Sequence, residues 1–589
     1  MFTVPNDTPG GIQEVRITTP EEEFQEQLAV LGDVAAGTVV LVAKQDVRAE
    51  ELQGRLADLN RDLGTNYALT QRRNGRLLRP LGGTTGPCSG SVAVVATGKR
   101  SLGQAIEELA GLGGIAIGPD PQVISRIDAV DHLQATTALE VRSIPPAGSG
   151  ITIAVLDTGV SPHPQLGERL RLEQGFDALD PGGLPLDRFD VPQLMGAMSG
   201  HGTAVAVLAA GDDLGMAPKA AILPIRVCGT DGSCLGSDVL IGLCHALTYA
   251  QRRGDPGKLV ITMGLGSDTP TRALKRILAS ALEGGASVVA AAGNQGSLGA
   301  RHYPAALELG GLLAVGALAQ CADFDDLAAG QRLAVGSSVK SGAWEITVEP
   351  ITLASGVSVG GGEMRLTNRF LAGGSGLDAF ARNAVFEFGL NHPVDGLTLQ
   401  LGGFGGTINL RINDVLRVRE ALDQLPPIIG GVGIELLLAG PAERRQGTLI
   451  LKGRISSFAI GGENLAIDNL CLGQPQPEDW FPAAFTTQGD YLDLAAPGAV
   501  LTSGRPPATT ETSDESQGIQ MGFAGTSLSA AQVAGVVALL RARNPALLPG
   551  DIERCLIGSA LPLPDPPNAP AAVGAGMVNA AAAAARCAP

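Results

Sequence analysis

Three short segments of the chain carry an aspartate, a histidine and a serine in settings that suit nucleophilic catalysis. Asp157 ends the apolar run "ITIAVLD", His201 lies among glycines in "SGHGTAVAVLAAG", and Ser527 stands in "FAGTSLSAA" before a long apolar stretch. A serine hydroxyl is too weakly acidic to attack a carbonyl by itself. An imidazole must take its proton, and a carboxylate must orient and stabilise the resulting imidazolium. The order aspartate, histidine, serine is one of the chain orders in which such triads occur.

Each of these residues also has an ordinary structural explanation. Ser527 could cap a helix, Asp157 could end a strand in a turn, and a single histidine is more often a packed side chain than a catalyst. The chain has six histidines, and five of them lie in surroundings without comparable signals: His132, His163, His245, His302 and His392. The presence of all three residue types at predicted element ends favours catalysis.

A serine nucleophile also needs donors for the oxyanion that forms during attack. Asn294 follows the apolar run "SVVAAAG", so its amide is predicted at the end of a strand. The backbone N–H of Ser527 lies at the start of a predicted helix, where the helix dipole favours negative charge. We expect these two groups to stabilise the oxyanion together.

The region 151–320 alternates apolar runs with helical periodicity. "ITIAVLD", "KLVITMGLG" and "ASVVAAAGN" are apolar enough for buried parallel strands. Leucines recur at helical spacing between them, and Ser237 or Asp238 is the expected cap of the first helix. This alternation predicts an α/β fold with a doubly wound parallel sheet, whose ligands bind at the carboxyl ends of its strands.

Residues 27–134 show a second alternation of strands and helices. Strands are predicted at 38–43 and 91–97, with weaker ones at 67–73 and 115–124. The two helical stripes are Leu52, Leu56, Leu59 and Leu63, and then Leu102, Ile106, Leu109 and Leu112. The order predicts a ferredoxin-like β-α-β-β-α-β domain of the α+β class.

Residues 321–484 consist of short alternating segments between glycine-rich turns, which predicts an inserted all-β domain. "GGENLAIDNLC" is similar to the closing strand of jelly-roll domains, and 419–427 is the one helical candidate. We expect the insert to bind a protein or a glycan, or to act as a rigid spacer over the cleft.

The chain is thus predicted to have six parts. They are a polar tail (1–26), a propeptide-like domain (27–134), a linker (135–150), the first catalytic part (151–320), the insert (321–484) and the second catalytic part (485–589).

Composition narrows the range of partners. The formal net charge of −17 argues against nucleic acid, and no segment is long and apolar enough to predict a membrane span. The first residues lack a basic and an apolar signal region, which predicts a cytoplasmic protein, or a secreted one if the chain is a trimmed form. With eight thinly spread cysteines, free thiols are expected, although Cys228 and Cys234 could close a small loop under oxidising conditions.

Several motifs together resemble those of the subtilisin-like serine proteases, the subtilases or peptidase family S8. They are "AVLDTGV", "GHGTAVA", "MAPKAAILPIRV", "AAAGNQG", "YPAALELGGLLAVGAL", "LDLAAPG" and "GTSLSAAQVAGVVALL". The resemblance covers about 146–320 and 485–589. It implies a serine endopeptidase with Asp157, His201 and Ser527 as the triad and Asn294 as the oxyanion donor.

The resemblance also implies where substrate lies. Substrate is expected as an extended strand along Gly264, Leu265 and Gly266, with Ala292 and Gly293 lining a pocket for a fairly large apolar side chain. The chemistry needs no cofactor, and structural calcium is an option without assigned ligands. The 27–134 domain resembles subtilase propeptides, which inhibit by laying their tail in the cleft, and the 131–150 segment is the expected site of release.

The chain departs from the family pattern at three places: Ala204 and Ala531-Gln532 stand where the family has histidine and Pro-His, and Gly264 stands where it has serine. None of these removes a catalytic atom. Two alternative functions stay open at this stage. One is a catalytically silent binding or scaffold protein that uses the insert, and the other is a peptide acyl-transferase or cyclase that uses the same residues.

Overall fold

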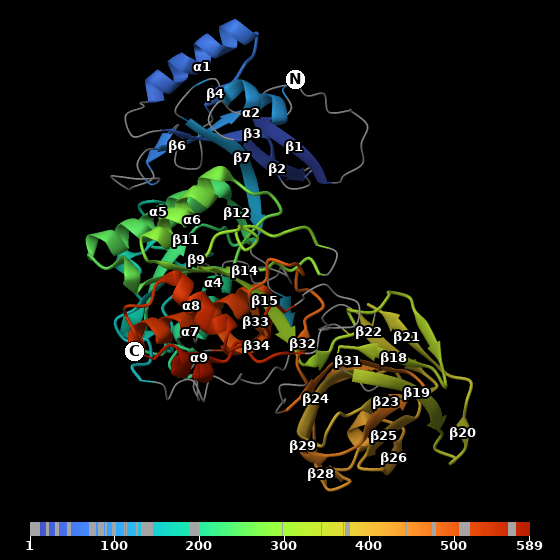
Figure 1. Ribbon diagram of the computed structural model, residues 1–589. Coiled ribbons are helices and arrows are strands. Elements are labelled where there is room, and N and C mark those ends of the chain that lie inside the picture. Colours follow the sequence, from blue (N-terminus) through green and yellow to red (C-terminus); the bar gives the residue numbers. More distant parts are fainter. Residues whose placement is uncertain are drawn as a thin grey trace.

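Three units make up the chain (Figure 1). The central unit contains a mixed sheet, a smaller α/β unit formed by the N-terminal segment lies on one side of it, and a β-rich unit lies on another. The computed structural model describes residues 12–18, 23–29, 34–43, 49–69, 78–80, 88, 91–96, 100, 102–110, 112, 115–124, 128–130, 145–187, 200–296, 299–342, 344–368, 370–371, 377–441, 444–473, 479–505, 519–563 and 573–588.

The central sheet is built from the apolar runs of the catalytic region. Its parallel strands, in spatial order, are β10 (Phe176–Asp177), β11 (Ala221–Arg226), β9 (Thr152–Asp157), β13 (Leu259–Met263), β14 (Ser287–Ala291), β15 (Leu312–Ala319) and β33 (Leu494–Pro497). The short strand β32 (Phe481–Pro482) pairs antiparallel with β15. The sheet is therefore mixed rather than wholly parallel as predicted.

Helices cover both faces of this sheet because successive strand residues point to opposite sides. Ile153 and Val155 face the core shared with α4 (His201–Ala210) and α7 (Thr526–Arg543), and α8 (Pro549–Ile557) and α9 (Ala580–Arg586) join that core. Ala154 and Leu156 face the core shared with α5 (Gly236–Arg252) and α6 (Arg272–Glu283). All ten residues of α4 are buried, which explains why its sequence consists mainly of small apolar residues.

The caps of α5 and α6 differ. The residue before α5 is Leu235, which makes no side-chain cap, so the expectation that Ser237 or Asp238 caps this helix is wrong; both lie inside its first turn. The helix starts earlier because Gly236 and Ser237 continue directly from the short strand β12 (Ser233–Leu235). At α6, Thr271 does cap, since its side chain accepts a hydrogen bond from Leu274 N–H.

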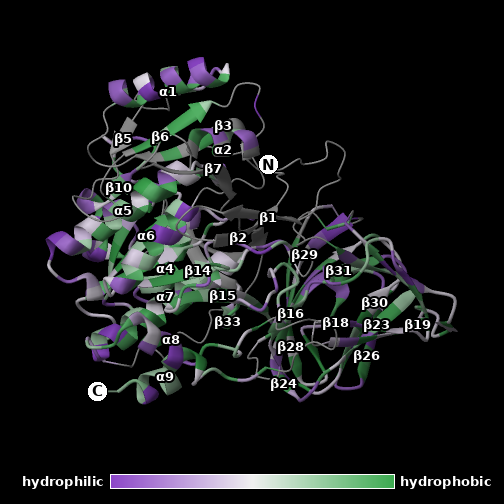
Figure 2. Cartoon of the chain, turned by 45° about the horizontal axis from the view of Figure 1, so that its top comes forward, coloured by the Kyte–Doolittle hydropathy of each residue, from purple (hydrophilic) through white to green (hydrophobic). Residues whose placement is uncertain are grey.

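The N-terminal unit is an antiparallel sheet with two helices. Its elements are β3 (Val34–Ala43), α1 (Ala49–Leu63), β4 (Ala68–Leu69), β5 (Leu78–Pro80), β6 (Ser91–Ala96), α2 (Leu102–Ala110) and β7 (Ile115–Ile124). The strand order is β7-β3-β6-β4, with β5 also on β6. Leu52, Leu56 and Leu109 are buried in its core, whereas Leu63 is exposed. In Figure 2, α1 is largely hydrophilic in colour and β6 largely hydrophobic.

Within the expected polar tail, β1 (Ile12–Thr18) and β2 (Glu23–Ala29) pair as an antiparallel hairpin. No element was predicted there, since the segment has little apolar alternation.

The β-rich unit consists of two antiparallel sheets with an apolar core between them. One sheet holds β16 (Cys321–Ala322), β17 (Arg332–Ala334), β21 (Glu363–Thr367), β22 (Asp378–Arg382), β24 (Val394–Gly403), β27 (Ile428–Ile429), β28 (Val432–Ala439), β29 (Arg445–Ile455) and β31 (Leu465–Leu472). The other holds β18 (Ser338–Ser341), β19 (Trp344–Thr352), β20 (Ser358–Val359), β23 (Ala384–Gly389), β25 (Ile408–Ile412), β26 (Val415–Arg419) and β30 (Phe458–Gly462). The helical candidate at 419–427 forms one 3-10 turn, Leu422–Gln424.

The expectation of free thiols is wrong. No free cysteine remains among the eight, all of which lie in described parts of the chain. The pairs are Cys88–Cys244, Cys228–Cys234, Cys321–Cys471 and Cys555–Cys587. The fold brings together cysteines as far as 156 residues apart, which spacing along the chain cannot reveal.

Candidate active site

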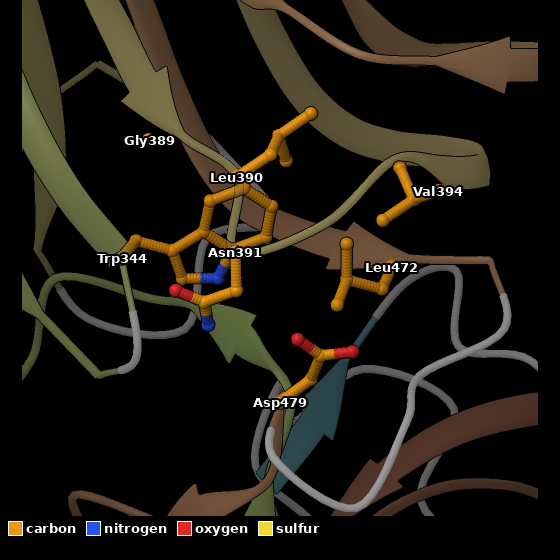
Figure 3. Close-up of a pocket in the computed structure, with 7 residues that line it drawn as sticks. All are labelled: Trp344, Gly389, Leu390, Asn391, Val394, Leu472 and Asp479. Atoms are coloured by element: carbon orange, nitrogen blue, oxygen red, sulfur yellow. The ribbon is translucent and has the colours of Figure 1, made fainter.

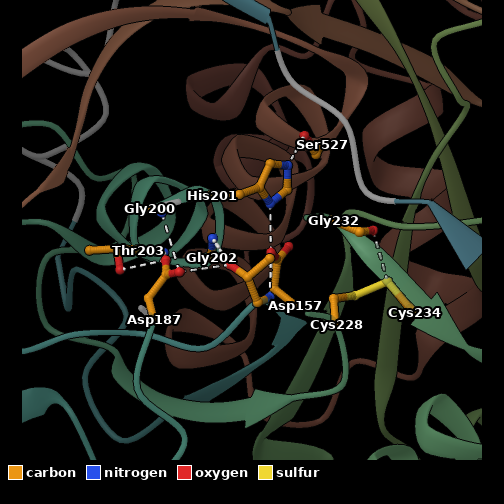
Figure 4. A network of polar contacts seen from close by, with 11 residues as sticks. Asp157, Asp187, Gly200, His201, Gly202, Thr203, Cys228, Gly232, Cys234 and Ser527 are labelled. Carbon is orange, nitrogen blue, oxygen red and sulfur yellow. Dashed lines mark hydrogen bonds and ion pairs between the residues drawn. A yellow bond between two sulfur atoms is a disulfide. The ribbon is translucent and has the colours of Figure 1, made fainter. Parts of the chain in front are cut away.

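Asp157, His201 and Ser527 form one hydrogen-bonded chain (Figure 4). His201 Nδ1 lies 2.6 Å from Asp157 Oδ1, and His201 Nε2 lies 2.9 Å from Ser527 Oγ. The three side chains are 0–2% exposed, so water hardly competes for these contacts. This is the geometry in which an imidazole can take a proton from a serine while a carboxylate holds the ring.

Helix and strand ends bring the three residues together. Asp157 is the last residue of β9, and His201 is the first residue of α4, directly after Gly200 with a φ of 94°. Ser527 is the second residue of α7 and follows the N-cap Gly525 by two positions. Ser527 therefore does not cap its helix, and its hydroxyl is held by His201 instead.

The carboxyl group of Asp187 anchors the start of α4, a feature that the sequence analysis missed. It accepts hydrogen bonds from the N–H groups of Gly200 and Thr203 and from the hydroxyls of Thr158 and Thr203. Since Gly200 has no side chain, Asp187 supplies the acceptor that an N-cap residue would normally provide. Thr158, next to Asp157, accepts from Gly202 N–H.

This network fixes His201 relative to Asp157. Burial raises the pKa of Asp187 to about 6, and the nearby charge of Asp157 adds to the rise, while the donors from Thr203 and Gly200 oppose it. Asp187 follows "GLPL" and lies 14 residues before His201 in the sequence. No motif or periodicity around it predicts this role, so only the folded structure identifies it.

Asn294 lies beside the nucleophile with a defined orientation. Its Oδ1 accepts hydrogen bonds from Thr526 N–H (3.0 Å) and the Thr526 hydroxyl (2.8 Å). Gly293 N–H in turn donates to Thr526 Oγ1. The amide oxygen of Asn294 thus faces the start of α7. These contacts leave the NH₂ group of the same side chain to act as a donor. Thr526 is a positioning residue that sequence reasoning overlooked.

Gly264 borders all three members of the hydrogen-bonded chain. A Cβ atom at this position would lie 2.8 Å from Ser527 Cβ, 3.2 Å from Asp157 Oδ2 and 3.4 Å from His201 Cε1. Asp157 Oδ2 has no hydrogen-bond partner within the described residues. Glycine at 264 therefore leaves the space above the serine open.

The other predicted substrate-binding residues flank the same place. Leu265 and Gly266 continue from Gly264 and are buried, and Ala292 and Gly293 follow the adjacent strand β14. The two segments lie on either side of the start of α7, since Gly293 contacts Thr526 and Gly264 borders Ser527.

The loop that leads to strand β12 also contacts the site. Cys228 N–H donates to the carbonyl oxygen of Asp157, and the disulfide Cys228–Cys234 ties β12 to that position (Figure 4). β12 pairs antiparallel with β7 of the N-terminal unit, with Ser233 opposite Ile124. From the sequence, Cys228 and Cys234 were expected at most to close a small loop, and nothing placed that loop near Asp157.

A second segment from the N-terminal side of the chain, β8, pairs with the strand that leads into the serine. β8 (Asp128–Val130) pairs with β35 (Ile519–Ala524), which itself pairs with β34 (Ala499–Arg505) and leads directly into Gly525 and Ser527. Segment 115–124 therefore pairs with the strand next to the loop bonded to Asp157, and segment 128–130 pairs with the strand that leads into Ser527.

The family model described as the subtilase family, peptidase S8, matches residues 148–576. The chain belongs to the subtilase family. Subtilisin Savinase from Lederbergia lenta is 37% identical over 178 residues, which are 29% of this chain and 57% of that protein. Thermitase from Thermoactinomyces vulgaris is 35% identical over 193 residues, 32% of this chain and 61% of that protein. The matches thus span less than two thirds of these relatives.

Among solved structures, fervidolysin from Fervidobacterium pennivorans, a keratinolytic enzyme related to subtilisin, is 16% identical with a TM-score of 0.47. The match covers 94% of this subtilase and 61% of that chain.

The departures from the subtilase pattern lie beside the triad without breaking it. Gln532 is buried in α7, and its Nε2 donates to the carbonyl oxygens of Pro497 and Leu528, which links α7 to β33. Ala204 and Ala531 are fully buried in the core between α4 and α7. The contacts of His201 persist with these replacements.

Among the described residues, no group of three or more histidine, cysteine, aspartate or glutamate side chains is arranged to hold a metal ion. In the same part of the chain, no helix combines the length and apolar character needed to span a membrane.

Proposed function

We propose that this subtilase is a serine endopeptidase whose triad is Asp157, His201 and Ser527. The observation that carries the proposal is the hydrogen-bonded chain from Asp157 Oδ1 through His201 to Ser527 Oγ. Its expected substrate is a peptide or a protein. No corresponding observation favours a silent scaffold, because all three side chains are in contact and none is replaced.

In the proposed reaction, Ser527 Oγ attacks the carbonyl carbon of the substrate while its proton passes to His201 Nε2. His201 then gives this proton to the departing amine nitrogen, and the C–N bond breaks to leave an acyl-enzyme. Water repeats the sequence and releases the acid. Asp157 stays ionised throughout and stabilises the imidazolium. No metal or cofactor takes part in these steps.

A fluorophosphonate probe tests the proposal directly, because it reacts only with an activated serine. After the N-terminal unit has been released, we expect stoichiometric labelling at Ser527, located by peptide mass spectrometry, and no labelling of Ser527→Ala. Labelling at another serine, or none in folded protein whose N-terminal unit has been released, would contradict the assignment.

The amide of Asn294 is expected to stabilise the oxyanion. Because this contact strengthens as charge develops, Asn294→Ala should lower kcat by roughly 10²–10³-fold with little change in KM. Steady-state kinetics on a chromogenic peptide measure both. A large increase in KM with kcat preserved would instead assign Asn294 to ground-state binding.

The N-terminal unit is proposed to act as an inhibitory propeptide. The pairing of β7 with β12 and of β8 with β35 supports this, since these pairings join the N-terminal segments to the loop bonded to Asp157 and to the strand that leads into Ser527. We therefore propose that the bond cut on activation lies between Ile124 and Asp128. The earlier expectation was 131–150, and residues 131–144 lie outside the described part of the chain.

The role of the β-rich unit stays a prediction. Figure 3 shows a small pocket at one end of it, lined by Trp344, Gly389, Leu390, Asn391, Val394, Leu472 and Asp479. His392 Nε2 lies 2.8 Å from Asp479 Oδ2 beside this pocket. Trp344 is only 3% exposed, so its ring offers little surface for stacking on a sugar.

For localisation, we propose that the chain works in an oxidising compartment rather than in the cytoplasm. Four disulfides support this, because such bonds are rare where thiols are kept reduced.

A further inference from the structure

His302 lies between the two glycine-containing segments that flank the nucleophile. A Cβ atom on Gly266 would lie 2.1 Å from His302 Nε2, and a Cβ atom on Gly293 would lie 2.6 Å from His302 Cγ. The imidazole therefore fills the space that side chains at these two positions would otherwise need. Its fractional exposure is 6%. No pattern around His302 in the sequence marks it as functional.

Several backbone contacts hold the ring in this place. Tyr303 N–H donates to the carbonyl of Ser267 (2.7 Å) and Ser267 N–H donates to the carbonyl of Tyr303 (2.9 Å), which ties the residue after His302 to the residue after Gly266. On the other side, the Tyr491 hydroxyl donates to the carbonyl of Ala292 (3.2 Å) and accepts the His302 backbone N–H. The ring is thus clamped to both segments.

The side chain of the residue whose carbonyl is attacked must enter between these same segments. Gly264 borders Ser527, and Gly293 is bonded to Thr526 beside it, so the gap between them opens directly next to the nucleophile. With a buried ring already between Gly266 and Gly293, little depth is left for that side chain.

We propose that His302 closes the pocket for the residue preceding the cut bond, so that this subtilase cuts after small residues such as alanine and serine. The inference rests on the proposed endopeptidase function. It replaces the expectation of a pocket for a large apolar side chain, which considered only the glycine and alanine residues of the two segments.

The imidazole of His302 is polar but is expected to be uncharged in this position. His302 Nδ1 is buried and has no hydrogen-bond partner within the described residues, although buried polar atoms usually have one. Burial lowers the pKa of His302 to about 4, so the ring is neutral near pH 7. The closed pocket therefore offers no positive charge that would attract acidic side chains.

Peptidyl diphenyl phosphonates that differ only in their last residue, alanine or phenylalanine, test the inference by their rates of reaction with Ser527. Wild-type protein whose N-terminal unit has been cut and released should react at least tenfold faster with the alanine probe. His302→Gly should raise the rate with the phenylalanine probe by at least roughly 10–200-fold, the range for a single methylene group in a hydrophobic pocket. His302→Ala should shift it in the same direction.

The control is His245→Ala, since His245 stacks on Phe176 outside the cleft with ring centroids 4.8 Å apart. It should leave the ratio of the two rates unchanged. A wild-type preference for phenylalanine, or an unchanged ratio in both His302 variants with fluorophosphonate labelling intact, would overturn the inference. Absence of fluorophosphonate labelling in folded wild-type protein whose N-terminal unit has been released would overturn the proposed function itself and the specificity with it.

Discussion

Replacing Ser527 with alanine is expected to lower kcat for a peptide substrate by on the order of 10⁶-fold, and His201→Ala by a similar factor. Each change removes one end of the proton transfer, since His201 Nε2 is the group 2.9 Å from Ser527 Oγ. The double variant should be no slower than either single variant. In each single variant the residue that remains, Ser527 or His201, already has no partner for the proton transfer. Initial rates on a chromogenic peptide at high enzyme concentration measure the residual activity.

The matched control for this prediction is Ser529→Ala. Ser529 is also a buried serine of α7, but its hydroxyl donates to the carbonyl of Ala496 instead of contacting His201. Its loss should cost stability and leave kcat within about tenfold of wild type. If the fold-loss in kcat of the double Ser527/His201 variant equalled the product of the two single fold-losses, the two residues would act independently. That result would contradict the proposed mechanism.

The contact of Asp157, His201 and Ser527 could be predicted from the sequence because each of these residues lies at the end or the start of an element with a strong local pattern. Asp157 follows an uninterrupted apolar run that is buried as β9, and Ser527 begins a stretch whose small apolar residues are buried on every side as α7. The strands of the central sheet carry the same signal. Parallel strands then bring their carboxyl ends to one edge without any further information.

The residues that support the triad could not be predicted in this way. Asp187 and Thr526 act through single hydrogen bonds to backbone groups distant in the chain, and no periodicity marks such contacts. The role proposed for His302 could not be predicted either, because it depends on Gly266 and Gly293, which lie 36 and 9 residues away in the sequence and leave room for the ring. In each case the signal lies in the tertiary arrangement.

The attachment of the N-terminal unit also depends on distant contacts. Val92 and Val94 of β6 belong to the same apolar core as α5 and α6, and Cys88 forms its disulfide with Cys244 in α5. A protease that cuts between Ile124 and Asp128 would thus keep its inhibitor covalently attached. Activation of this subtilase then requires a second event besides the cut, namely reduction of the disulfide or destruction of the unit.

Processed wild-type protein is therefore expected to stay as one band of full mass on a non-reducing denaturing gel and to separate into two fragments after reduction. Ser527→Ala should stay a single band in both. The new N-terminus, identified by mass spectrometry, should lie between Ser125 and Asp128. Release of the N-terminal fragment without reductant would show that Cys88 and Cys244 do not form the proposed link.

The same link should determine how activity responds to dilution. A tethered unit acts at an effective concentration in the millimolar range, so diluting the protein to nanomolar levels should not free the cleft. In the double variant Cys88→Ser/Cys244→Ser the cut unit can dissociate, and activity per molecule at nanomolar concentration should exceed that of wild type by about 10²–10⁴-fold. Cys321→Ser/Cys471→Ser, which removes a disulfide at the base of the β-rich unit, should behave as wild type. Equal gains on dilution in wild type and in the Cys88/Cys244 variant would mean that strand pairing and apolar packing alone set the inhibition.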